Sequence, residues 1–205
     1  MALISTILIL IMTLSVAGAP EFEVVTTTAM VRDITSRVVG DRGTVVGLMG
    51  EGVDPHLYKP TAADAKLILS SDMVFYNGLL LEGRMTDTFM KAARIGKTVF
   101  PVTELIEEEY LLEPLEMEGH WDPHVWMDVS AWSHAVEAVA QAMCEQDPEY
   151  CAAYQNRATS YQKKLAELHT YIEKSIDSIP ETGRILITAH DAFNYFGRAY
   201  GIEVI

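Results

Sequence analysis

The sequence predicts an α/β protein in which two lobes with parallel-rich sheets are joined by one long helix. Three observations indicate this arrangement. Short β-branched runs alternate with helical patterns up to about residue 146. A segment free of glycine and proline then extends from Glu149 to Ile179. A strand pattern returns after Pro180, and because the chain stops at residue 205, we expect the second lobe to be incomplete.

The first lobe is placed at residues 20–146, where four strands are predicted over 22–28, 44–49, 73–76 and 98–102. Helices are expected over 32–39, from Thr61 onward, and between the last two strands. Thr61 and Asp64 have the spacing of a capping box at the start of the second helix. Strands that alternate with helices predict βαβ units and a mainly parallel sheet.

The linking helix is placed at residues 147–180. At 1.5 Å per residue, ~30 residues make a rod of roughly 45 Å, long enough to run along two lobes. The second lobe begins at 181–205, with strands over 184–188 and 201–205 and a short helix between them. One apolar stripe recurs at steps of three and four residues along the linking helix: Tyr150, Tyr154, Ala158, Tyr161, Leu165, Leu168, Ile172 and Ile176.

Composition narrows the class of protein. The 205 residues include 29 acidic and 15 basic side chains, which give a formal net charge of −14. Such a chain lacks the basic face that phosphate contacts require, so we expect no nucleic-acid partner. A hydrophobic fraction of 49% with 21% charged residues indicates a folded core rather than a disordered chain.

The first 19 residues are expected to be a secretory signal peptide. An apolar run from Leu3 to Val16 is followed by the small residues 17–19, which match an A-x-A cleavage pattern. No basic residue precedes the run and Pro20 follows it, so a membrane-retained helix is the alternative. We expect a periplasmic or otherwise extracytoplasmic protein, either free or membrane-associated. Export would permit a disulfide between Cys144 and Cys151, and two unpaired thiols are the alternative.

Histidines are the candidate chemical groups. His56 and His124 each end the same tripeptide, Asp-Pro-His, and His190 directly follows an apolar strand pattern. Ligands bind beyond the carboxyl ends of strands in doubly wound sheets, so His56 and His190 are expected at that edge. His134 and His169 lie among polar neighbours in helical patterns and are expected at the surface.

These residue types suit a metal site. Neutral imidazole is a preferred ligand for zinc and other divalent first-row ions. The preceding proline restricts the loops of His56 and His124, and Asp54, Asp122 and Asp191 are candidates to orient the rings. For each histidine taken singly, an ordinary hydrogen-bonded loop residue is the alternative. The sequence contains no H-E-x-x-H, G-x-S-x-G, P-loop or G-x-G-x-x-G motif.

Four ordered segments resemble the zinc and manganese receptors of ABC importers, the TroA-like family of metal-binding lipoproteins and adhesins. They are 49–61 (MGEGVDPHLYKPT), 77–82 (NGLLLE), 122–128 (DPHVWMD) and 188–196 (TAHDAFNYF). The resemblance implies the two-lobe metal-receptor fold, with a metal ion held between the lobes. It implies His56 and His124 from the first lobe and His190 from the second lobe as ligands.

The resemblance also implies a function. The chain is expected to be a non-enzymatic, monomeric solute-binding receptor that captures Zn²⁺ or Mn²⁺ as transported ligand for the permease of an ABC importer. The alternatives are a metal-dependent hydrolase and a surface adhesin with an incidental metal site.

The sequence also departs from the family pattern. The family's acidic fourth ligand has no counterpart up to residue 205, so we expect weak binding that prefers zinc. Neither cysteine is placed to carry a lipid after the signal peptide, and His120 is at most an auxiliary ligand.

Overall fold

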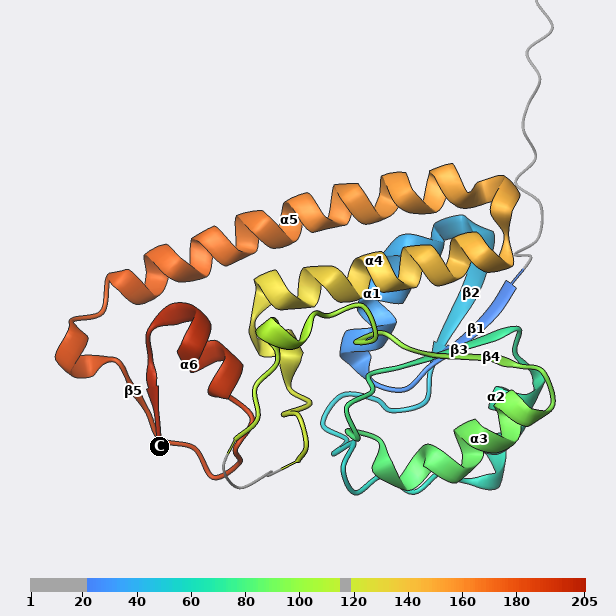
Figure 1. Cartoon of the computed structure of the whole chain (residues 1–205), viewed down its shortest axis with the longest axis horizontal. Coiled ribbons are helices and arrows are strands. Elements are labelled where there is room, and N and C mark those ends of the chain that lie inside the picture. Colours follow the sequence, from blue (N-terminus) through green and yellow to red (C-terminus); the bar gives the residue numbers. More distant parts are fainter. Residues whose placement is uncertain (1–21, 115–118) are drawn as a thin grey trace, which may run out of the picture.

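The computed structural model describes residues 22–114 and 119–205 (Figure 1). The predicted signal peptide lies outside these residues. Within the described part of the chain, no helix has both the length and the apolar character needed to cross a membrane. The long helix α5 runs along one side of the molecule, with the first-lobe sheet beneath one end and a smaller β5–α6–β6 unit beneath the other (Figure 1).

The first lobe is built on a four-stranded parallel sheet with the order β2-β1-β3-β4. Its register places Val24 of β1 opposite both Val45 and Met73. The predicted parallel sheet is thereby confirmed. The strands are β1 (Phe22–Thr26), β2 (Gly43–Gly47), β3 (Met73–Tyr76) and β4 (Thr98–Pro101).

Two local details explain where the elements begin and end. β1 is shorter than predicted because the side chain of Thr28 accepts a hydrogen bond from the Val31 N–H and caps the next helix. The predicted capping box is confirmed at the following helix. There the Thr61 side chain accepts the Asp64 N–H at 3.2 Å, and the Asp64 carboxylate accepts the Thr61 N–H at 2.7 Å.

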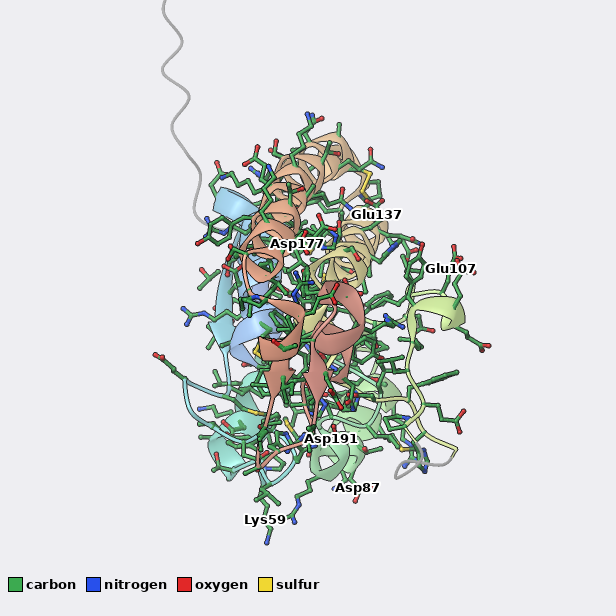
Figure 2. All side chains as sticks on the ribbon, turned by 90° about the vertical axis from the view of Figure 1, so that its left-hand side faces the viewer. Lys59, Asp87, Glu107, Glu137, Asp177 and Asp191 are labelled. Atoms are coloured by element: carbon green, nitrogen blue, oxygen red, sulfur yellow. A yellow bond between two sulfur atoms is a disulfide. The ribbon has the colours of Figure 1, made fainter. Side chains whose placement is uncertain are left out.

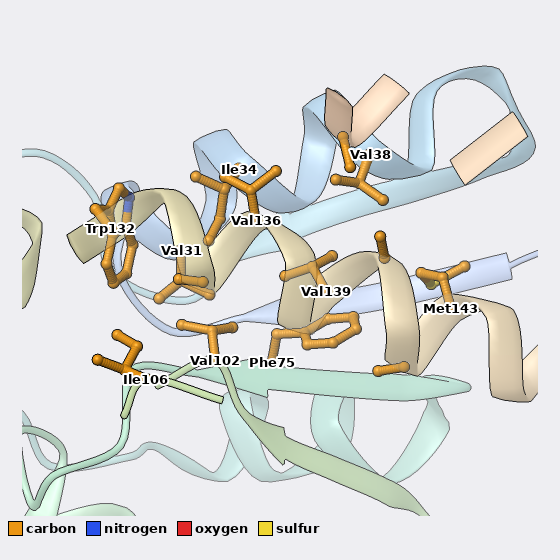
Figure 3. Close-up of a cluster of buried hydrophobic side chains, with 14 of the residues drawn as sticks. Val31, Ile34, Val38, Phe75, Val102, Ile106, Trp132, Val136, Val139 and Met143 are labelled. Carbon is orange, nitrogen blue, oxygen red and sulfur yellow. The ribbon is translucent and has the colours of Figure 1, made fainter. Parts of the chain in front are cut away.

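Helices cover both faces of the sheet. α1 (Ala29–Val39) and α4 (Val129–Gln146) pack on one face, and α2 (Ala62–Ser70) and α3 (Thr86–Arg94) lie on the other (Figure 1). Adjacent residues of β3 point to opposite faces, so Phe75 joins the α1–α4 core in Figure 3, whereas Val74 joins the second core. Charged side chains such as those of Glu107, Glu137 and Asp177 are exposed, and Figure 2 shows Glu107 at the right-hand edge of the molecule.

α4 and α5 form a helical hairpin. α5 (Cys151–Asp177) has 27 residues, which confirms the predicted long helix, and a disulfide between Cys144 and Cys151 closes the turn between the two helices. The alternative of two unpaired thiols is therefore excluded. The predicted apolar stripe is only partly buried: Tyr154 is fully buried, whereas Leu168 is 43% exposed. In Figure 1 the C-terminal part of α5 extends past the N-terminal end of α4.

The second unit consists of β5 (Ile185–Leu186), α6 (Asn194–Tyr200) and β6 (Glu203–Val204), with β5 and β6 parallel. These strands are shorter than predicted. The two histidines expected at the surface, His134 and His169, are half-buried against aromatic rings. His134 packs on Tyr110, and Nδ1 of His169 lies 3.1 Å from the Tyr200 hydroxyl.

Candidate metal centre

Three histidines from distant parts of the sequence converge. One ring nitrogen from each of His56, His124 and His190 lies within 4.8 Å of those of the other two. The ring centroids are 5.2 Å apart for His56 and His124, 5.5 Å for His56 and His190, and 5.1 Å for His124 and His190. The structure therefore brings together all three residues that the sequence singled out, while their role as metal ligands stays a prediction.

Each histidine is carried by a different connection. His56 lies in the loop between β2 and α2, and His190 lies between β5 and α6. Both loops leave the carboxyl end of a parallel strand, as predicted. His124 directly precedes the 3-10 turn Val125–Met127, which leads into α4. The exposed residue His120 is not a member of this group.

The spacing of the nitrogen atoms fits a tetrahedral metal ion. Nε2 of His56 and Nε2 of His124 are 3.1 Å apart. Two zinc–nitrogen bonds of about 2.0–2.1 Å at a tetrahedral angle would separate their nitrogens by about 3.3 Å. The two imidazoles therefore need little movement to share an ion, and three imidazoles leave one coordination position open.

The site is closed on one side and open on the other. His124 is 3% exposed and His56 is half-buried, whereas His190 is exposed. The three histidines line a cavity of about 450 Å³, together with apolar side chains such as those of Trp126 and Phe193. Burial lowers the pKa of His56 from its ordinary value of 6.5, and the nearby His124 lowers this pKa further. Low pKa favours the neutral ring that binds metals.

Asp122 fixes the ring of His124. Its Oδ1 lies 2.7 Å from Nδ1 of His124 and accepts the His124 backbone N–H at 2.9 Å. Because a carboxylate only accepts hydrogen bonds, Nδ1 carries the proton and Nε2 keeps its lone pair for an ion. Burial raises the pKa of Asp122, but the hydrogen bonds from His124 outweigh burial and lower this pKa overall. The charged carboxylate also offsets the charge of a bound cation.

The other two candidate aspartates act differently. Oδ1 of Asp54 accepts the backbone N–H of His56 at 2.9 Å, and Oδ1 of Asp191 accepts a hydrogen bond from Asn194 at 2.7 Å. Within the described residues, neither carboxylate is hydrogen-bonded to a histidine ring. Of the three aspartates that the sequence suggested, Asp122 is the one that contacts a histidine ring in the described residues.

A buried polar network supports the loop of His124. Glu82 is 3% exposed, and its Oε1 accepts hydrogen bonds from the Thr27 hydroxyl at 2.6 Å and the Asn77 backbone N–H at 2.8 Å. The side-chain amide of Asn77 donates to the carbonyl of Pro123 at 3.0 Å. The turn needs glycine at Gly78, where φ is +93°. The ends of β1 and β3 are thereby tied to the residue before His124.

Residues of α6 hold the same loop from the second unit. The Tyr195 hydroxyl donates to the Asp122 carbonyl at 2.8 Å and accepts the Leu112 N–H at 3.0 Å. The amide of Asn194 donates to Oδ2 of Asp122 at 3.2 Å. Sequence reasoning assigned no role to Asn194, Tyr195 or Asn77, although all three fall within the segments that carry the family resemblance.

The fold and the histidine cluster define an α/β protein with a candidate metal centre between a larger lobe and a smaller unit. Comparison with known proteins identifies the family. The family described as zinc-uptake complex component A periplasmic matches residues 24–205. The chain belongs to this family.

The relatives carry metal-binding names. The zinc-binding protein TroA of Treponema pallidum (strain Nichols) is 42% identical over 181 residues, which cover 88% of this chain and 58% of the relative. The manganese-binding lipoprotein MntA of Bacillus subtilis (strain 168) is 38% identical over 184 residues, which cover 90% of this chain and 60% of the relative. The chain therefore spans somewhat less than two thirds of each.

The solved structures agree with the fold. The periplasmic zinc-binding protein TroA from Treponema pallidum superimposes with a TM-score of 0.84 at 41% identity, and the match covers 89% of this chain and 65% of that structure. The predicted two-lobe receptor fold is confirmed for the part of the fold that this chain covers.

Proposed function

We propose that this protein is an extracytoplasmic receptor that captures a divalent metal ion, with Zn²⁺ preferred over Mn²⁺, for the permease of an ABC importer. His56, His124 and His190 are the proposed ligands, and the metal is cargo rather than a catalytic cofactor. One observation carries the proposal: ligand nitrogens from three distant loops lie within 4.8 Å of one another.

The chemistry of the donors supports zinc. Imidazole nitrogen suits Zn²⁺, whereas Mn²⁺ favours oxygen-rich coordination. The names of the relatives span both metals, since one is a zinc-binding protein and another a manganese-binding lipoprotein. We therefore rest the choice of zinc on the three nitrogen donors of this chain.

The remaining features of the proposal follow from the family. We propose that residues 20–146 and 181–205 belong to two lobes linked by the helix of residues 147–180, and that the protein acts outside the cytoplasm as a monomer. We also propose that it binds its ion without turnover. A hydrolase would use an open coordination position to activate water, whereas a receptor holds and releases the ion unchanged.

Calorimetry on the purified chain at neutral pH tests the proposal. We expect one Zn²⁺ per chain, weaker binding of Mn²⁺, and no metal-dependent hydrolysis of ester or phosphate substrates. A His56→Ala variant should lose most of the zinc affinity. A His120→Ala variant is the matched control, since His120 is exposed and lies outside the cluster. Tight Mn²⁺ binding, or zinc binding that is indifferent to His56, would contradict the assignment.

A further inference from the structure

Two asparagine side chains hold the loop that carries His124, one from each side. Asn77, at the end of β3, donates to the Pro123 carbonyl at 3.0 Å from within the first lobe. Asn194, the first residue of α6, donates to Oδ2 of Asp122 at 3.2 Å from the second unit. The Asn194 bond therefore crosses between the two parts of the protein, whereas the Asn77 bond does not.

The same nitrogen of Asn194 makes a second hydrogen bond. Nδ2 also donates to Oδ1 of Asp191 at 2.7 Å. A primary amide has two N–H groups, so one side chain can serve both carboxylates at once. Asp122 holds the ring of His124, and Asp191 directly follows His190. The amide thus joins the loop of His124 to the loop of His190.

The amide of Asn194 also lies between two negative charges. Asp122 and Asp191 are two carboxylates that reach a single nitrogen atom, and without a donor between them their charges repel. The two oxygens of Asp122 have different partners: Oδ1 is hydrogen-bonded to the His124 ring, and Oδ2 accepts a hydrogen bond from the Asn194 side chain. A change at Asn194 is therefore transmitted to the His124 ring through one rigid carboxylate.

The docking of α6 does not depend on Asn194. Tyr195 is fully buried and its hydroxyl is hydrogen-bonded to both Asp122 and Leu112. Arg198 adds a hydrogen bond to the Tyr110 carbonyl at 2.7 Å. These contacts keep α6 in place when the Asn194 side chain is shortened, so the bridge can be removed separately from the packing.

We propose that Asn194 is a positioning residue that clasps the His124 and His190 loops together before the metal ion arrives. This inference rests on the proposed function, since it assigns Asn194 a role in holding the ion. The clasp preorganises two of the three ligands. Its main effect is on release of the ion, because separation of the two loops then requires the loss of the hydrogen bond from Asn194 to Asp122.

The first measurement is zinc release from the full chain into an excess of chelator. Loss of an outer-shell partner costs about 10–100-fold in metal affinity, so we expect Asn194→Ala to release zinc about tenfold faster. Asn194→Asp should release zinc faster still, because it removes both donors and adds a third carboxylate. An acidic side chain suits the start of a helix, so α6 should persist in that variant. Asn156→Ala is the matched control, because Asn156 is exposed on α5, and its release rate should equal that of the unmodified chain.

The second measurement is hydrogen–deuterium exchange of the metal-free protein, which does not depend on zinc binding. In Asn194→Ala we expect faster exchange on both sides of the clasp, at residues 122–126 and at 188–192. Faster exchange confined to 188–194 would overturn the clasp, because it would show a purely local role. Unchanged zinc release and unchanged exchange in both variants would also overturn it. If the unmodified chain failed to bind zinc, the proposed function would fall, and the exchange data would still decide whether the clasp exists.

Discussion

The tripeptide Asp-Pro-His occurs twice in this chain, at 54–56 and at 122–124, and the two copies sit in different environments. In the second copy the aspartate is fully buried and contacts both the ring and the backbone of His124. In the first copy the aspartate is exposed and accepts the backbone N–H of His56. Both histidines nevertheless reach the same cluster.

The difference comes from the surroundings of each loop. The 122–124 loop is held by Asn77 from the first-lobe sheet and by Asn194 and Tyr195 from α6. The 54–56 loop lies at the surface, where Asp54 is solvated. The same three residues therefore place one proposed ligand, His124, in a buried loop where Asp122 contacts its ring, and the other, His56, in a more exposed loop without that contact. The identical motif supplies the same side chain in both loops, and the tertiary contacts determine how firmly each histidine is held.

Removal of the ligands themselves should give the largest effects. We expect His124→Ala to lower zinc affinity by more than about 100-fold, because loss of a ligand should exceed the cost of losing an outer partner. His56→Ala should lower the affinity by about 100-fold, and His190→Ala by less than His56→Ala, because His190 is the most exposed of the three. Competition with a chelator of known affinity measures all three. Equal losses for His124→Ala and His56→Ala would contradict the proposed difference between the two tripeptide loops.

The two aspartates test the comparison directly. We expect Asp122→Ala to lower zinc affinity by about 10–100-fold, because the His124 ring loses the partner that sets its tautomer. Asp54→Ala removes a backbone hydrogen bond from an exposed loop, so its effect should stay below about tenfold, under the range for an outer-shell partner. Calorimetry on the matched pair measures the difference. Comparable losses in the two variants would show that the tripeptides are equivalent after all.

Much of this organisation could be predicted from local sequence. The strands and helices of the first lobe follow from hydrophobic periodicity, and the Thr61–Asp64 capping box is a short-range signal. The candidate site was visible because the tripeptide Asp-Pro-His is repeated and because His56 and His190 follow predicted strands. Each of these signals is contained in a short stretch of the sequence.

The support of the site could not be predicted in the same way. The hydrogen bonds from Asn194 and Tyr195 reach Asp122 across 72 and 73 residues. An asparagine at a helix start has no local pattern that reveals such a distant carboxylate. The exposure of Leu168 on α5 likewise depends on tertiary packing, which the spacing of apolar residues within α5 does not reveal.

A region away from both tripeptides provides a control. The Cys144–Cys151 disulfide closes a short loop between α4 and α5. Loops of this size contribute roughly 2–3 kcal/mol to the free energy of unfolding, so a Cys144→Ala, Cys151→Ala double variant should lose about that much. Zinc affinity should remain unchanged, because the fold persists around the ligand loops. Urea unfolding measures the change in stability, and calorimetry measures the zinc affinity. A large loss of zinc affinity would mean that the disulfide-bonded end of the α4–α5 hairpin affects the histidine loops.

Asp147 resembles Asp122 without any connection to the cluster, and it should give the smallest effect. Oδ2 of Asp147 accepts hydrogen bonds from the Arg42 guanidinium at 2.9 Å and from the Tyr154 hydroxyl at 2.8 Å. The hydrogen bond from Arg42 lowers the pKa of Asp147 below its ordinary value of 3.8. A lowered folded-state pKa means that the unfolded chain binds the proton more readily. The stabilisation is therefore complete above pH 4 and is lost as the pH falls through the lower folded-state value.

We expect Asp147→Asn to reduce the free energy of unfolding by about 1.5 kcal/mol at pH 7, as for a hydrogen bond to a charged group. The gap to the unmodified protein should close as the pH falls from 4 toward 2. Urea unfolding across this pH range measures the gap, and calorimetry at pH 7 should show unchanged zinc binding. A gap that stayed constant with pH would mean that the Asp147 charge contributes nothing. Loss of zinc binding in Asp147→Asn would mean that any buried aspartate affects the site, and the contrast between Asp122 and Asp54 would then reflect burial alone rather than contact with the His124 ring.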